Sequence, residues 1–381
     1  MKILTISKLF FLLTGFLFAL FAIRTIGVEV YGETTFIIGL LYVFDFVFSG
    51  KNEINILKSK SKSLSSGIIK SLLKGSSIFF LFLFVLSFFL SNVLSNYLFF
   101  YPIISWLSGM QAVFQMHINK NYELKFLAYN NLLIGIFNLS IGILLIYFFN
   151  EIGYFISISL SLLISVLYYL SKFKLSFKDV ILSKPLYFWN NKASFIFSSF
   201  SITSFGDVLP IFVKFYFDSY ILGIYMISVK IIKTGLNFIA NLYANYIIKS
   251  NIKIKSLIKI TYVSLSVYIL ILLAYYYIKE ISYFIGLIKM IIGVKDSQAF
   301  INYSIYFVSI FFLDSIVIAL SPLLIRLNAK IIIILRIIHI STLSCMLYSN
   351  NLTLENFSLI ISLAIFISLF FVPIYTKHKQ K

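Results

Sequence analysis

The residues best suited to chemistry in this sequence are charged side chains inside long apolar runs. Lys230 and Lys233 lie well within one run and are three positions apart, a spacing that puts them on one helix face. An ionisable group at the centre of a membrane helix costs about 2.5–3.5 kcal/mol, so it normally faces a wet cavity or a partner. The two lysines therefore predict a water-filled cavity that attracts an anion. The alternative is that they reach the inner surface or pair with Asp45 and Asp207.

The remaining charges within apolar runs are more scattered. Arg24 lies one turn from the outer end of its run, where it could equally be an interfacial anchor, and Lys214 ends a later run. Glu33, beside Gly32, is interpreted as an interfacial residue. The candidates for ion coupling or for ion pairs between helices are Asp45, Asp207, Asp314 and Arg336.

Cysteine and histidine offer little for metal binding. The chain has a single cysteine, Cys345, and its three histidines are scattered: His117, His339 and His378. No spacing resembles that of metal ligands. We therefore expect no metal site and no cofactor.

Composition places these residues in a membrane protein. Of 381 residues, 60% are hydrophobic and only 12% are charged, about half the usual charged share of soluble proteins. The apolar runs are continuous rather than alternating, which predicts helices and not a barrel. The net charge of +19 would suggest nucleic-acid binding in a soluble protein, but here it suggests a bias of basic residues towards the cytoplasm. We expect no nucleic-acid partner.

About twelve apolar runs are long enough to span, since a hydrocarbon core of ~30 Å needs about 20 helical residues. The first follows Lys2 and Lys8 and is interpreted as a retained helix rather than a cleaved signal peptide. Pro210 and Pro322 interrupt two of the runs and predict bends. The predicted spans are 8–28, 31–50, 75–96, 98–118, 125–149, 152–171, 193–214, 220–247, 260–278, 299–325, 327–349 and 354–375.

The basic residues orient these spans. With a cytoplasmic N-terminus, 24 Lys and Arg lie in inner segments, three lie in outer loops and five remain within spans. This asymmetry predicts that both termini are cytoplasmic, because one missed span would scramble the alternation. The loop near 51–74 is rich in lysine and serine and is predicted to be flexible, whereas the outer segment Tyr283–Gly293 is predicted to lie at the membrane interface.

The chain also divides near its middle into two sets of six spans. The expected halves are 1–192 and 193–381. A shift of 191 residues places Gly32 on Gly223, each just after a short outer turn. Transporters are often built from such repeats.

Three segments resemble parts of polysaccharide exporters. They are RTIGVEVYGETTFIIGLL from Arg24, DVLPIFVKFYFDSYILGIYMISVKII from Asp207 and FIGLIKMIIGVKDSQAF in the outer segment. Together with the length and the number of spans, they make the chain similar to Wzx-type O-antigen flippases of the MOP (multidrug/oligosaccharidyl-lipid/polysaccharide) exporter superfamily.

The resemblance implies an all-α, MATE-like fold with two six-helix bundles around a central cavity. It also implies an undecaprenyl diphosphate-linked oligosaccharide as substrate, moved across the bacterial inner membrane by ion-coupled antiport. The residues that would meet the diphosphate and sugars are Arg24, Lys214, Lys230 and Lys233, of which only Arg24 matches a family motif. Membrane lipids are expected partners, and an O-antigen polymerase and a chain-length regulator are candidate ones.

Other functions stay open. A multidrug exporter of the same superfamily would favour carboxylates, and the firm mid-span charges are balanced, with Lys230, Lys233 and Arg336 against Asp45, Asp207 and Asp314. A lipid II exporter is close in chemistry, although the chain is short for one. A membrane-embedded polysaccharide polymerase usually carries a large outer loop, which this chain lacks, and a scaffold without transport is a third class. We expect a transporter and not an enzyme.

Overall fold

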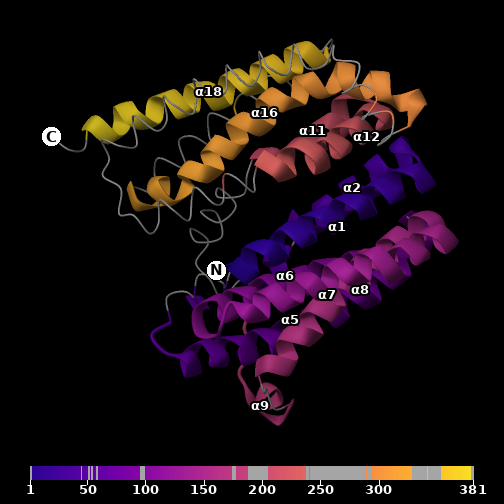
Figure 1. Cartoon of the computed structure of the whole chain (residues 1–381). Coiled ribbons are helices and arrows are strands. Elements are labelled where there is room, and N and C mark those ends of the chain that lie inside the picture. Colours follow the sequence, from indigo (N-terminus) through magenta and orange to yellow (C-terminus); the bar gives the residue numbers. More distant parts are fainter. Residues whose placement is uncertain are drawn as a thin grey trace. The chain divides into compact units, whose positions relative to one another are not determined.

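In the residues it describes, the structure, a computed structural model, consists of helices joined by short non-helical segments (Figure 1). Among the described residues, five helical stretches are long and apolar enough to cross a membrane, so the chain is a multi-pass membrane protein: Ile3–Ile26, Lys62–Phe89, Lys125–Phe173, Ser219–Leu236 and Asp296–Ile316. The described residues are 2–43, 45–49, 52, 55–56, 59–94, 99–173, 177–187, 205–236, 240, 286, 289, 293–327, 341 and 353–378.

Several predicted features lie outside these ranges. The span at 260–278 and the join near residue 192 are not described, and neither are nearly all of the span at 327–349 and most of the outer segment Tyr283–Gly293. Contacts divide the chain into two units. One contains Met1–Gly27 and Thr34–Ile196, and the other contains Val28–Glu33 and Phe197–Lys381.

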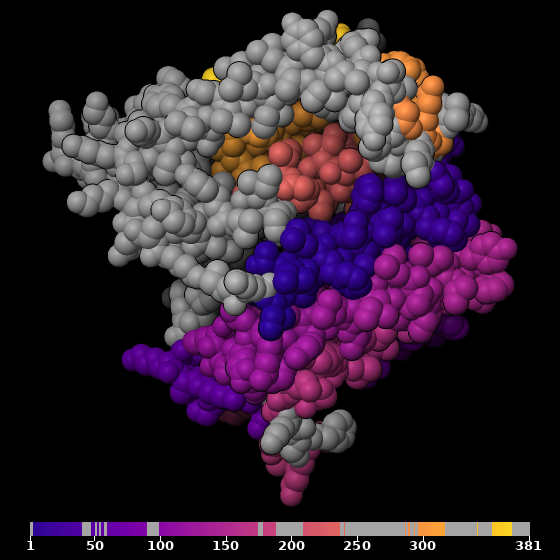
Figure 2. All heavy atoms as spheres, in the orientation of Figure 1, coloured from indigo at the N-terminus to yellow at the C-terminus, as the bar shows by residue number. Residues whose placement is uncertain are grey.

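In the first unit, α1 packs along α7 and α8, and their side chains lie directly against one another on the face drawn in Figure 2. Small residues allow this approach, because a Cβ atom on Gly135 would lie 2.8 Å from Cε1 of Phe10. The helices of this unit are α1 (Lys2–Ile26), α2 (Val28–Val43) from Thr34 onwards, α3 (Asp45–Ser49), α5 (Lys62–Leu94), α6 (Phe100–Asn121), α7 (Lys125–Phe137), α8 (Ile143–Phe173) and α9 (Phe177–Leu182). A π-helical segment, Asn138–Gly142, joins α7 to α8.

Helix α8 folds back on itself at Asn150. The backbone there has φ 51° and ψ −123°, which interrupts the helix. Beyond it, the Ser157 hydroxyl donates to the carbonyl oxygen of Gly142 at 3.1 Å, although 15 residues of straight helix would separate the two by about 22 Å. The stretch Lys125–Phe173 is therefore a helical hairpin, with its turn between the predicted spans 125–149 and 152–171.

The lysine- and serine-rich segment that the sequence predicted to be flexible is helical from Lys62 onwards. The Ser61 hydroxyl accepts a hydrogen bond from the Leu64 amide at 3.2 Å, the arrangement by which serine caps a helix start. The Lys62 ammonium lies 3.9 Å from the centre of the Tyr122 ring, a favourable cation–π distance. Capping and this contact explain why the prediction of a flexible loop was wrong here.

Lysines at the predicted cytoplasmic end of this unit bind other parts of the chain. Lys70 pairs with Asp179 at 2.8 Å. Lys74 donates to the carbonyl oxygens of Ile181 and Ser183. Lys120 donates to the Ile56 carbonyl at 2.7 Å and also to the carbonyl and hydroxyl of Ser59. These lysines hold short segments against the ends of α5 and α6.

The second unit contains α11 (Phe205–Tyr216), α12 (Ser219–Ser228), α16 (Val294–Leu327) and α18 (Leu354–His378), with a π-helical segment, Val229–Lys233, directly after α12. Asp218 caps α12, since its carboxylate accepts from the Ile221 amide at 2.8 Å. Helices α16 and α18 lie side by side (Figure 1) and run in the same direction, because successive residues of one contact successive residues of the other. That direction is what the predicted topology requires of two even-numbered spans.

The first turn of α2 crosses α12 at two glycines within this unit. A Cβ atom on Gly32 would lie 2.5 Å from the Cα atom of Gly223, and one on Gly223 would lie 2.3 Å from the carbonyl oxygen of Val28. Only glycine permits this backbone approach, as at many close helix crossings in membranes. The two glycines that the 191-residue shift aligned thus touch one another.

Candidate functional site

The centre of the candidate site is an ion pair between the π-helical segment and α16. Lys233 Nζ lies 3.5 Å from Asp314 Oδ2, and the two side chains are only 6% and 1% exposed. Because a membrane-buried charge is expensive unless it is paired, such groups mark substrate paths, ion paths or essential helix contacts.

Aromatic packing sets the register of this pair. Two turns earlier on α12, the buried ring of Tyr225 meets Phe307 edge-on, with ring centres 4.9 Å apart, and it also contacts Phe311 at 5.5 Å. Helices α12 and α16 run parallel from this contact, so Lys233 arrives beside Asp314 one to two turns further on. The apolar contacts therefore position the charges.

Lys230 has a different environment from Lys233, although the sequence predicted one shared face. Lys233 is buried, whereas Lys230 is exposed. The π-helical segment explains the difference, because its wider turn increases the angle between positions three residues apart. The Thr234 hydroxyl donates to the Val229 carbonyl at 3.1 Å and so satisfies a backbone group that the altered ladder leaves available.

As a result, the charge of Lys233 is balanced by Asp314, whereas Lys230 is exposed. Within the part of the chain that the structure describes, no carboxylate forms an ion pair with Lys230. π-Helical segments occur frequently at functional sites. The exposed side chain of Lys230, three residues from a buried pair of opposite charges, is the feature that best fits the binding of an anion.

Lys214 lies at a helix junction, apart from this centre. Its ammonium pairs with Glu33 Oε1 at 2.5 Å and donates to the Ser219 hydroxyl at 2.9 Å, and that hydroxyl donates to the same Glu33 oxygen at 2.6 Å. The Lys214 and Glu33 side chains are 36% and 46% exposed. This cluster ties the end of α11 and the start of α12 to the first turn of α2, next to the crossing of Gly32 and Gly223.

The other predicted site residues are not brought to the ion pair by the described structure. Arg24 is exposed in the last turn of α1. Asp45 begins α3 and Asp207 lies in the first turn of α11, but their side chains are outside the described part, as is the whole of Arg336. A role for these four residues stays a prediction.

Reading the sequence missed three polar contacts at the outer ends of the predicted spans. They join Glu33 to Lys214, Tyr220 to Asp296 at 2.9 Å, and Tyr306 to Glu355 at 2.8 Å. The predicted topology contained a signal for the first, because Glu33 and Lys214 fall at the same membrane level with opposite charges. The other two join a tyrosine to a carboxylate across different helices, a partnership that a single sequence does not reveal.

The described residues thus include an exposed lysine (Lys230), a buried ion pair (Lys233 with Asp314) and a partly exposed ion pair at a helix junction (Lys214 with Glu33). Within the same residues, no three His, Cys, Asp or Glu side chains gather as a metal site would require. These groups can bind an anion and carry charge within a membrane. No protein-family model matches the chain, and no curated protein or solved structure is significantly similar to it.

Proposed function

We propose that the protein is a flippase that moves an undecaprenyl diphosphate-linked oligosaccharide across the bacterial inner membrane by ion-coupled alternating access. The observation that carries the proposal is the exposed Lys230 beside the buried pair of Lys233 and Asp314. A diphosphate is a strong acceptor for an ammonium group. The described residues include five helical stretches that could cross a membrane, which suits a cargo that is itself lipid-anchored.

Charge argues for this cargo over a lipophilic cation. Asp314 is already engaged by Lys233, so it is a poor binding group for a cationic drug. Lys230 would repel such a drug and attract the diphosphate. The resemblance of the segments from Arg24 and Asp207 to polysaccharide exporters points in the same direction, and it suggests a repeat unit of O-antigen type as the glycan.

The pair itself suits a role in the transport cycle. The π-helical segment that continues α12 contributes Lys233 and α16 contributes Asp314, so any movement of one helix along the other must separate the charges or carry them together. A buried pair of this kind has strongly coupled charges, and ion binding at Asp314 would compete with Lys233. In the proposed cycle, this competition links ion movement to the helix positions.

The test is a flipping assay with the purified full-length protein in proteoliposomes. Undecaprenyl diphosphate-linked oligosaccharide is placed in the inner leaflet, and its arrival outside is measured with a glycan-cleaving enzyme that cannot enter. Loss of a hydrogen bond between charged groups costs about 1.5–3 kcal/mol, so Lys230→Ala should slow flipping about ten- to hundredfold. Lys230→Arg should retain most of the rate.

The matched control is Lys8→Ala, since Lys8 is another exposed lysine, on α1. It should flip at the normal rate. If Lys230→Ala also flips normally while remaining folded, Lys230 does not bind the cargo and the proposal loses its main support. A purified protein that produces polymer instead would favour the polymerase alternative.

A further inference from the structure

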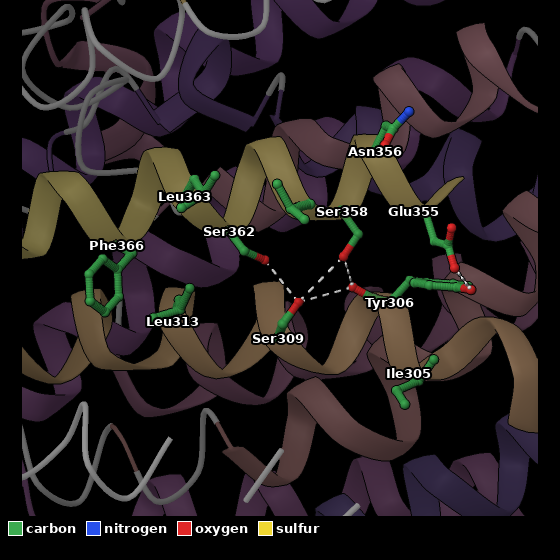
Figure 3. A pocket seen from close by; sticks show the side chains of 11 residues that line it. Ile305, Tyr306, Ser309, Leu313, Glu355, Asn356, Ser358, Ser362, Leu363 and Phe366 are labelled. Atoms are coloured by element: carbon green, nitrogen blue, oxygen red, sulfur yellow. Dashed lines mark hydrogen bonds between the residues drawn. The ribbon is translucent and has the colours of Figure 1, made fainter. Parts of the chain in front are cut away.

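A second feature of the molecule is an open groove between α16 and α18, with a volume of about 630 Å³ (Figure 3). Its floor contains three serines, Ser309 from α16 and Ser358 and Ser362 from α18. Ser309 Oγ lies 2.8 Å from Ser362 Oγ and 3.4 Å from Ser358 Oγ. These hydroxyls bond to one another across the two helices, so they join α16 and α18 along the groove.

Polarity changes along the length of the groove. At one end the Tyr306 hydroxyl donates to Glu355 Oε1 at 2.8 Å. At the other end the lining is apolar and includes Leu363 and Phe366. Figure 3 shows the two ends separated along the parallel helices, with the serines between them. A ligand that fits must carry a polar head and an apolar body.

Part of the groove lining is apolar and exposed. Leu359 and Leu363 line the groove and are 59% and 49% exposed, and leucines exposed on a membrane helix contact acyl chains. The distribution of basic residues predicts that α16 and α18 both start on the outer side. The end with Tyr306 and Glu355 therefore lies at the level of the outer headgroups, and the apolar end lies deeper in the same leaflet.

Charge narrows the class of headgroup. Among the described residues that line the groove, Glu355 is the only one formally charged at neutral pH, so the groove disfavours anionic lipids and the diphosphate of the proposed cargo. A primary ammonium has three donors and forms short, charge-assisted bonds with a carboxylate, whereas a trimethylammonium has none to donate. We infer that this groove binds a phospholipid with a primary-amine headgroup, of the phosphatidylethanolamine class, in the outer leaflet. The inference goes beyond the proposed transport function and holds for any cargo.

The experiment measures lipid binding to the purified full-length protein by native mass spectrometry, with phosphatidylethanolamine, phosphatidylcholine and phosphatidylglycerol of identical acyl chains. Phosphatidylethanolamine should bind about tenfold more tightly than either of the others. Glu355→Gln should abolish that preference. The control Glu29→Gln, which changes an exposed carboxylate at the start of α2, should leave the preference intact.

A steric variant tests the location. Leu363→Trp should fill the groove and remove the tight site for all three lipids, whereas Leu167→Trp, at an equally exposed leucine of α8, should not. As an independent readout, phosphatidylethanolamine with a photoreactive acyl chain should label peptides of α16 and α18 in the unmodified protein. The inference is overturned by equal binding of the three lipids, by a preference that survives Glu355→Gln, by labelling elsewhere, or by displacement of the bound lipid by the diphosphate-linked glycan.

Discussion

Removing one partner of the buried ion pair should destabilise the protein more than removing both. At 3.5 Å and an effective dielectric constant of about 20, two unit charges attract by about 5 kcal/mol. Water screens this attraction little, because the two side chains are 6% and 1% exposed. Asp314→Asn removes the negative charge that pairs with the buried Lys233, so we expect the free energy of unfolding to fall by about 3–5 kcal/mol. Lys233→Met should have a similar cost.

The double variant Lys233→Met/Asp314→Leu places apolar groups of similar size at both positions. Replacing a buried pair in this way is often neutral or stabilising by about 1–4 kcal/mol, so the double variant should be more stable than either single one. The assay is unfolding in mixed micelles with increasing sodium dodecyl sulfate, followed by circular dichroism. Additive losses in the double variant would show that the two charges do not interact, and the assignment of this pair as the centre of the site would be wrong.

Three further predictions concern the supporting structure. Gly223→Ala should cost about 1–3 kcal/mol of stability, because its Cβ atom would lie 2.3 Å from a backbone carbonyl of α2. The control Gly15→Ala should not destabilise, since a Cβ atom there meets nothing within 4 Å. Equal losses of stability in the two variants would exclude the close helix crossing. Glu33→Gln should lower the free energy of unfolding by at most about 1 kcal/mol, because its pair with Lys214 is partly exposed. In 1 M salt, the stability difference between this variant and the unmodified protein should shrink. A stability loss that salt does not change would contradict an electrostatic role for the pair. Asn150→Gly should stabilise the hairpin by about 1 kcal/mol, since φ 51° with ψ −123° suits glycine. Asn150→Val should destabilise the hairpin, and both effects are measured as shifts of the thermal unfolding midpoint. A lower midpoint for the glycine variant than for the valine variant would contradict the turn geometry.

Much of the helical structure could be predicted from apolar run length alone. A run that must satisfy its backbone within lipid has to be a helix, and the predicted spans 8–28, 98–118, 299–325 and 354–375 each overlap a helix closely. Helix ends were less predictable. The start of α5 at Lys62 depends on the Ser61 cap and on the contact with Tyr122, and neither changes hydropathy.

In the candidate site, too, some features could be predicted from the sequence and others could not. The sequence identified Lys233 and Asp314 as charges that needed an explanation, because their cost inside a membrane depends on residue type and depth. It could not say that they pair, since the register of α12 against α16 is set by Tyr225, Phe307 and Phe311. It also could not separate Lys230 from Lys233, because the spacing argument assumes an α-helix and the structure has a π-helical turn there.

The lysines that bind carbonyl groups near α5 and α6 have a consequence for how the protein is made. In the predicted topology, Lys70, Lys74 and Lys120 lie on the cytoplasmic side, where basic residues help to retain their segments while the nascent chain inserts. After folding, Lys74 and Lys120 donate to backbone oxygens and Lys70 pairs with Asp179. Each of these side chains thus serves first as a topology signal and then as a contact that holds two segments of the folded chain together. Reversing its charge would disturb insertion and folding together, so only a neutral replacement such as glutamine can separate the two.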